Sequence, residues 1–158
     1  MSEKTIAASR ISAATHKLMS AYMCVLQPVC EDTGMPPLAA DIMLFIYNNP
    51  QFAAAKDICS VCGFKPGIVS FHVDKLVNEG LLTREEDVSD RRKTKLLLTE
   101  KAIPVVEKGR ALQAVFEKRI LDGLSEQDKM QFVRCMKHVI GNIDAIAKEH
   151  THARRKND

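Results

Sequence analysis

Residues 73–84 read VDKLVNEGLLTR, in which a helix ends at a glycine and passes into a short strand. Gly80 stands where helices commonly end in a left-handed residue, and the apolar and branched residues after it favour a β-strand. A second strand is predicted over residues 94–98, TKLLL, after a charged and polar stretch from Glu85 to Lys93. The pattern predicts a helix followed by a β-hairpin with a charged tip.

The helix before Gly80 is predicted to begin at Pro66, because proline suits the first turn, where its missing N–H would have no partner. Val69, Val73 and Leu76 are spaced four and three residues apart, which predicts an inward face. Small, polar and aromatic groups are left on the outward face, namely Gly67, Ser70, Phe71, Asp74, Lys75 and Asn78.

Three helices are predicted before Pro66. A short one spans residues 53–62 and is closed by Gly63, and another spans 38–47 and stops at Asn48-Asn49-Pro50. A long amphipathic helix from Thr5 to Val29 precedes them, weakened by Pro28 in its last turn and ended by residues 34–37. Its apolar stripe is Ile11, Ala14, Leu18, Tyr22, Val25 and Val29.

Two helices are predicted after the hairpin. Thr99 is expected to cap the first, which runs to Gly123, and Ser125 with Asp128 resembles a capping box for the second. The second helix carries a coiled-coil-like apolar seam of Phe132, Met136, Val139, Ile143 and Ile146.

The predicted fold class is mainly α with a small β-hairpin wing (α+β), a winged helix-turn-helix with long N- and C-terminal dimerisation helices. The expected division is an N-terminal dimerisation helix over 1–34, a winged unit over 35–98, C-terminal dimerisation helices over 99–150 and a basic tail over 151–158. In such a unit the second helix of the pair enters the DNA major groove, and the hairpin tip places cations on phosphates or in the minor groove.

Composition is that of an ordinary globular protein: 158 residues, 46% hydrophobic, 27% charged and a formal net charge of +3. The isoelectric point of 8.6 lies below the level typical of strongly basic DNA-binding domains. The local charge is higher, because residues 90–95 hold Arg91, Arg92, Lys93 and Lys95 against Asp90. A solvated charged turn explains this hairpin tip as well as DNA binding does.

The cysteines and the terminus indicate a cytoplasmic protein. Five cysteines, an odd number, are spread through predicted helices, which disfavours a disulfide framework. No stretch is long and apolar enough to span a membrane, and the first residues lack the pattern of a signal peptide.

The sequence resembles the MarR family of bacterial transcription regulators. The resemblance rests on residues 73–84, on the wing tip from Asp87 to Arg92, and on Leu98-Thr99-Glu100-Lys101. It implies a homodimer that binds pseudo-palindromic double-stranded DNA with one winged unit on each half-site. The DNA-binding residues expected on the recognition helix and the wing are Lys65, Ser70, Phe71, Lys75, Arg91, Arg92, Lys93 and Lys95.

The sequence departs from the family at three positions. Ser89 and Ala102 stand where the family usually has arginine and glycine, and Phe71 stands where many members have a basic residue. Ser89 and Phe71 leave open an alternative function, a winged-helix protein-interaction module that has lost DNA binding.

Resemblance to the family also implies release from DNA by a small effector, often aromatic and anionic. Five residues are candidates for its site by position, although a packing role explains each of them better: His16, Tyr22, Met23, Met43 and Tyr47. Part of the family senses peroxides through a cysteine of the first helix, which makes Cys24 and Cys30 candidate redox residues, although buried and inert thiols fit the sequence better.

No catalytic activity is predicted. The sequence shows no glycine-rich phosphate loop, no nucleophile elbow and no motif of paired carboxylates or histidines. The single C-x-x-C pair, Cys59 and Cys62, lacks the second pair or the histidines that a zinc site needs. We therefore expect neither a metal nor another cofactor.

Overall fold

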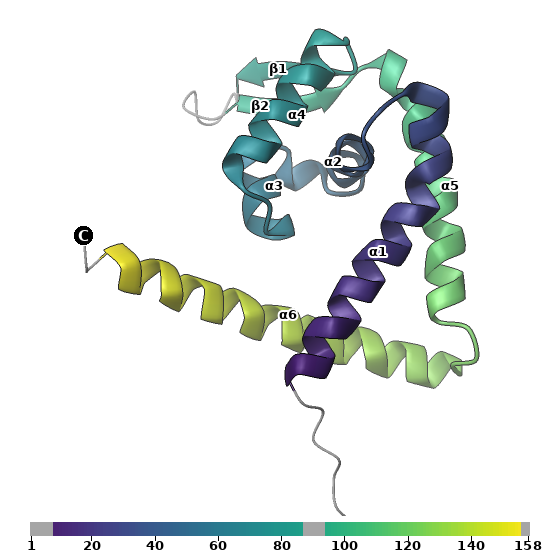
Figure 1. Cartoon of the computed structure of the whole chain (residues 1–158), viewed down its shortest axis with the longest axis vertical. Coiled ribbons are helices and arrows are strands. Elements are labelled where there is room, and N and C mark those ends of the chain that lie inside the picture. Colours follow the sequence, from purple (N-terminus) through teal and green to yellow (C-terminus); the bar gives the residue numbers. More distant parts are fainter. Residues whose placement is uncertain (1–7, 87–93, 156–158) are drawn as a thin grey trace, which may run out of the picture. The chain divides into compact units, whose positions relative to one another are not determined.

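The computed structural model describes residues 8–86 and 94–155, the last six of these for their backbone only. The chain forms two compact units, one ending at Phe116 and one beginning at Glu117 within helix α5. The elements of the described residues are α1 Ala8–Thr33, α2 Pro37–Asn48, a 3-10 turn Pro50–Phe52, α3 Ala55–Cys62, α4 Pro66–Asn78, β1 Leu82–Glu86, β2 Thr94–Leu98, a 3-10 turn Glu100–Ala102, α5 Ile103–Ile120 and α6 Glu126–Arg155 (Figure 1).

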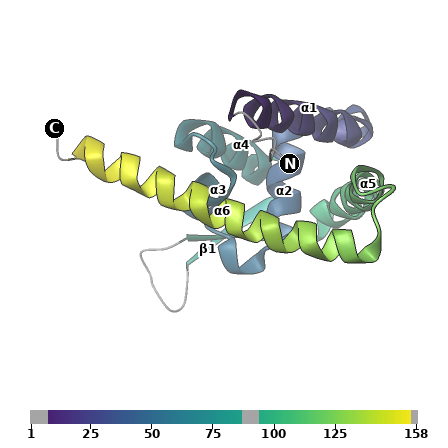
Figure 2. The same cartoon turned by 90° about the horizontal axis from the view of Figure 1, so that it is seen from below.

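Helix α2 forms the centre of the first unit. It contributes Ile42, Met43 and Leu44, all almost completely buried, and it lies between α1 and the β-hairpin (Figures 1 and 2). Ile58 of α3 and Leu76 of α4 complete this core. Because each of these side chains fills an interior position, the three short helices hold fixed positions against one another.

Strands β1 and β2 pair antiparallel, with Leu82 opposite Leu98 and Glu86 opposite Thr94. Leu96, at the centre of β2, is buried in the core, and its N–H donates to the carbonyl of Ala53 just before α3, at 2.8 Å. The hairpin is therefore bonded to the start of the helix pair as well as packed on it.

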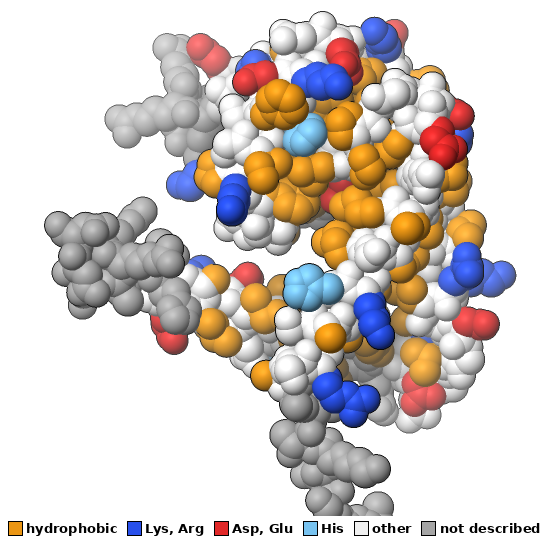
Figure 3. All heavy atoms as spheres, viewed as in Figure 1, with side chains coloured by type: hydrophobic (Ala, Val, Ile, Leu, Met, Phe, Trp, Pro, Cys, Tyr) orange, Lys and Arg blue, Asp and Glu red, His pale blue; other side chains and the backbone are white. Residues whose placement is uncertain are grey.

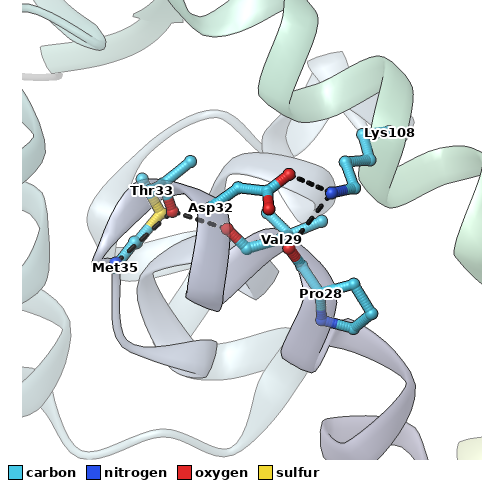
Figure 4. A network of polar contacts seen from close by, with 6 residues as sticks. All are labelled: Pro28, Val29, Asp32, Thr33, Met35 and Lys108. Atoms are coloured by element: carbon cyan, nitrogen blue, oxygen red, sulfur yellow. Dashed lines mark hydrogen bonds and ion pairs between the residues drawn. The ribbon is translucent and has the colours of Figure 1, made fainter.

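Helix α5 is tied to the end of α1 by Lys108 (Figure 4). Its ammonium group forms an ion pair with Asp32 and donates to the carbonyl of Pro28 at 3.1 Å. In the same turn the Thr33 hydroxyl donates to the carbonyl of Val29 at 2.6 Å and accepts from the N–H of Met35 at 3.3 Å. These bonds satisfy polar groups at the helix end, which has no further turn to pair with.

The helix boundaries follow the sequence predictions closely. Gly63, Gly80 and Gly34 lie in the left-handed region, with φ of +70°, +71° and +67°, and each ends a helix. Helix α1 nevertheless continues through Pro28 to Thr33, one turn beyond the predicted Val29. The fully buried Leu26 is absent from the predicted stripe, whereas Leu18 within that stripe is exposed.

The predicted cap at Thr99 is wrong. The Thr99 hydroxyl makes no capping bond and instead donates to the carbonyl of Gly80 at 2.7 Å, while a 3-10 turn precedes α5. The side chain lies beside the turn that ends α4, so its hydroxyl bonds that carbonyl and leaves the following helix uncapped.

The second unit consists of the end of α5 and helix α6. Ser125 caps α6 as predicted, because its hydroxyl oxygen accepts from the N–H of Asp128 at 3.2 Å. From 126 to 149 every side chain is exposed except that of Lys129, which is half-buried. The described side chains of α6 therefore form no core, and an isolated helix gains little stability from propensity alone.

Candidate nucleic-acid interface

The outward face of α4 is apolar at one end and polar at the other. Ile68 and Phe71 are exposed in its first two turns, followed by Asp74, Lys75 and Asn78. The opposite face is buried, with Val69, His72, Val73 and Leu76 in or beside the core. Ser70 lies between the two faces and is exposed, so the structure places Ser70, Phe71 and Lys75 on the accessible side of the helix, as predicted.

Three polar contacts hold the hairpin and the residues after it against α4 and the turn at its C-terminal end. Arg84 on β1 forms an ion pair with Asp74, the hydroxyl of Thr99 bonds the carbonyl of Gly80, and the ammonium of Lys101 donates to the carbonyl of Glu79 at 2.8 Å. The N–H of Thr99 also donates to the carbonyl of Leu81 at 3.1 Å. The hairpin therefore has a defined position relative to α4.

His72 is a packing residue on α4. Its ring is buried and meets the ring of Phe71 edge-on, with centroids 5.2 Å apart and an interplanar angle of 78°. Burial, and secondarily the charge of Lys75, lowers the pKa of His72, which favours its neutral form. Its Nδ1 atom has no hydrogen-bond partner among the described residues.

The predicted basic contact residues stand at several places around this face. Lys65 precedes the first turn of α4 and is exposed, Lys95 is exposed on β2, and Lys75 lies 3.8 Å from Glu79. Lysine and arginine side chains stand beside exposed apolar groups over this part of the molecule (Figure 3). Arg91, Arg92 and Lys93 lie outside the described residues.

A cavity of about 380 Å³ lies between α3, α4 and the hairpin. Lys56 and Arg84 supply two cations at its wall, and Ser70 and Thr94 supply two hydroxyl groups. Sequence reasoning missed Lys56, Arg84 and Ile68 as residues of this region. Lys56, three residues before Cys59, and Ile68, two residues after Pro66, could have been assigned to this region from their places on the predicted helices. The position of Arg84 depends on how the hairpin folds back.

Two of the residues predicted for effector binding lie in polar clusters between helices. The Tyr22 hydroxyl donates to Asp41 at 2.7 Å and accepts from the amide of Gln113 at 2.6 Å. Gln113 in turn accepts from Asn48 at 3.0 Å. These bonds connect α1, α2 and α5 through one half-buried tyrosine, whose ring lies 5.5 Å from that of Phe116.

The other cluster joins Tyr47 to α5. The guanidinium of Arg110 lies 4.6 Å from the centre of the Tyr47 ring and donates to its hydroxyl at 3.2 Å. Tyr47 also lines a cavity of about 210 Å³. Of the remaining effector candidates, His16 is exposed on α1, Met23 is half-buried and Met43 is completely buried in the core.

Replacing Tyr22 by phenylalanine should destabilise the protein by about 1–2 kcal/mol, because Asp41 loses its donor and Gln113 its acceptor in a partly desolvated place. The matched control is Tyr47→Phe, which removes an exposed hydroxyl and keeps the ring under Arg110. Its effect should stay within about 0.5 kcal/mol. Urea unfolding measures both, and equal effects of the two substitutions would contradict the role given to Tyr22.

Asp41 should make the protein less stable as the pH rises from about 4 to about 7. Burial raises the pKa of the Asp41 carboxyl, although the Tyr22 hydroxyl opposes this shift. The folded state then holds a proton that the unfolded state has lost, so this contribution is complete below the unfolded pKa and disappears as the pH passes the folded one. Unfolding of the wild type and of Asp41→Asn at both pH values tests this, since the difference between them should change with pH.

The candidate redox thiols differ in their surroundings. Cys24 is exposed and Cys30 is half-buried. Burial, with the charge of Glu31, raises the pKa of Cys30, and burial raises that of Cys62 to about 11. Raised values reduce the thiolate that reacts with peroxides. Within residues 8–86 and 94–149, no cluster of three or more histidine, cysteine or acidic side chains could hold a metal ion.

Comparison with known proteins agrees with this geometry. Residues 33–93 match the sequence profile described as the MarR family, and this range covers α2, the helix pair and β1. This segment is similar in sequence to the MarR family. It includes the helix-to-wing passage of residues 73–84, on which the resemblance in sequence rested.

Solved MarR structures share the fold over most of the chain. A MarR regulator from Listeria monocytogenes complexed with 26mer DNA is 15% identical, with 89% of this chain and 91% of that chain covered and a TM-score of 0.74. The Staphylococcus aureus MepR–DNA complex is 17% identical, with 90% and 99% covered and a TM-score of 0.68. CouR from Rhodococcus jostii, bound to p-coumaroyl-CoA, is 17% identical, with 82% and 91% covered and a TM-score of 0.68. The predicted mainly α, winged helix-turn-helix fold is confirmed.

Among the residues that the structure describes, no helix combines the length and the apolar character needed to span a membrane.

Proposed function

We propose that this protein is a sequence-specific DNA-binding transcriptional regulator of the MarR type that acts in the cytoplasm as a homodimer. The observation that carries the proposal is the exposed face of α4, held by Arg84, Thr99 and Lys101 beside a hairpin whose connecting residues include Arg91 and Arg92. In this arrangement α4 enters the major groove while the hairpin tip reaches the backbone or the minor groove.

Each contact residue has a distinct role in the proposal. Lys65 and Lys75 neutralise phosphates on the two sides of the groove, and Ser70 bonds a phosphate or a base edge. Lys95 with Arg91, Arg92 and Lys93 places cations where the minor groove approaches the hairpin tip, with phosphates on either side. DNA bound to the Listeria and Staphylococcus relatives supports this assignment through the shared fold.

The dimer is proposed to form through the apolar face of α6, together with α1. Seven apolar side chains of α6 recur at helical spacing and are between 37% and 57% exposed: Phe132, Val133, Met136, Val139, Ile140, Ile143 and Ile146. Ile11, Leu18 and Met19 of α1 are exposed as well. A second copy of the chain offers the same apolar faces and so supplies a matching partner, as two-fold symmetric dimers require.

We further propose that the protein acts as a repressor and leaves DNA when a small aromatic or anionic effector binds. The clusters of Tyr22 and Tyr47 connect α1 and α2 to α5, so a ligand that displaces these bonds changes how the winged unit is held. The p-coumaroyl-CoA bound to CouR, an aromatic and anionic molecule, is consistent with such a ligand. Release by oxidation of Cys24 or Cys30 is the less favoured alternative, because the pKa of Cys30 is raised.

Selection of DNA from a random duplex library tests the proposed function without knowledge of the operator. The purified dimer should enrich a pseudo-palindrome with two half-sites whose centres lie about one helical turn or a multiple of it apart. A pool that remains random after repeated rounds, with protein shown to be folded, would favour the protein-interaction module.

A further inference from the structure

The two most accessible apolar side chains of α4 lie where a DNA-reading helix presents its base contacts. Phe71 is 64% exposed and Ile68 is 44% exposed. They are three residues apart and therefore lie next to each other on one side of the helix. This exposed pair on a 13-residue helix is suited to a partner that covers it.

The polar groups around them are poorly suited to reading guanine or cytosine. Guanine is read most often by a bidentate arginine or by lysine, and α4 contains no arginine and one lysine, which faces Glu79 at 3.8 Å. Asp74, the side chain that could accept from cytosine, forms an ion pair with Arg84. The accessible N-terminal half of α4 thus offers mainly apolar contacts.

Thymine presents the one apolar group in the major groove, its C5-methyl, and apolar side chains including phenylalanine contact it. Phe71 is suited to a fixed contact of this kind because its ring packs edge-on with that of His72, with centroids 5.2 Å apart. Lys65 and Lys75, one near each end of the pair, favour a polyanion over an apolar protein surface as the partner.

We infer that Ile68 and Phe71 are specificity-determining residues that read thymine methyl groups, so that each operator half-site carries thymine opposite the N-terminal half of α4. The inference rests on the proposed function. It adds which base the recognition helix prefers and which two side chains set that preference.

Replacement of thymine by deoxyuridine tests the inference, because it removes the methyl group and keeps the base pairing. In the operator obtained by selection, thymines are replaced one symmetric pair at a time, and the dissociation constant is measured by fluorescence anisotropy. At contacted positions the wild type should bind the uracil duplex about fourfold more weakly for each lost methyl, as expected for one buried methyl group. Replacement at other positions should leave the ratio near one.

Variants connect the effect to the side chains. Phe71→Ala and Ile68→Ala should each bring the ratio of uracil to thymine affinity closer to one at a contacted position. Asn78→Ala, at the other end of the same helix, should keep the wild-type ratio. The wild-type measurement decides the question even if a variant fails to fold.

The outcomes separate this inference from the proposed function. Specific binding that is unaffected by deoxyuridine at every position overturns the thymine reading and leaves a DNA-binding regulator. The thymine reading is also overturned if Phe71→Ala and Ile68→Ala both lose as much affinity as the wild type when deoxyuridine replaces thymine. Other groups would then sense the methyl. Absence of any selected operator overturns both.

Discussion

Ile143→Asp is expected to convert the dimer into a monomer and to weaken binding to palindromic DNA by about 100-fold or more. The reason is that two winged units in one dimer bind both half-sites together, whereas separate monomers bind them independently. Ile143 is 57% exposed at the centre of the α6 face, with Val139, Ile140 and Ile146 around it. In a dimer a carboxylate there would be buried without a partner, which is costly. Sedimentation equilibrium measures the mass, and anisotropy measures DNA binding.

Ala145→Asp is the matched control, because it introduces the same charge on the opposite side of α6. Ala145 is exposed and lies away from the stripe by helical periodicity. This variant should remain a dimer. An Ile143→Asp protein that keeps the mass of a dimer would show that α6 is not the interface.

Arg91→Ala combined with Arg92→Ala is expected to weaken specific DNA binding by about 30-fold to 1,000-fold, because cations at a hairpin tip neutralise phosphates or enter the minor groove. The hairpin base supports this expectation, since Arg84 joins β1 to Asp74 of α4 and Thr99, directly after β2, bonds Gly80 in the turn after α4. Loss of two phosphate contacts should also reduce the slope of affinity against salt by about 1.8. Anisotropy over a range of salt concentrations gives both values.

Lys118→Ala combined with Arg119→Ala is the control for charge. These two exposed residues lie in the last turn of α5, outside the winged unit, and their loss changes the net charge equally. This variant should keep the wild-type salt slope. If both double variants reduce affinity and slope alike, the wing would contribute only through the total charge of the protein.

Local patterns were sufficient to predict most of the fold. Gly63 and Gly80 mark helix ends through a conformation that other residues adopt at a cost, and the spacing of Val69, Val73 and Leu76 defines the buried face of α4. The strand over residues 94–98 has its predicted bounds, whereas the strand predicted over residues 81–84 lies at Leu82–Glu86. Glycine helix ends, apolar spacing and strand composition depend only on residues close together in the sequence, so they can be recognised without knowing the tertiary structure.

The remaining features depend on contacts between distant parts of the chain. Thr99 has the sequence context of a helix cap, yet Gly80 lies close enough to take its hydroxyl. Leu26 is buried and Leu18 exposed because α1 packs on α2 only towards its C-terminal end. The exposure of Ile68, the ion pair of Arg84 with Asp74 and the bonds of Tyr22 likewise arise from tertiary packing.

If the winged unit binds a particular DNA sequence, anisotropy with the selected operator and with a scrambled duplex of the same composition should show it. Affinity for the operator should exceed that for the scrambled duplex by about 10³-fold or more and should fall steeply as salt increases. Equal and weak binding to both duplexes at all salt concentrations would contradict sequence-specific binding by the winged unit.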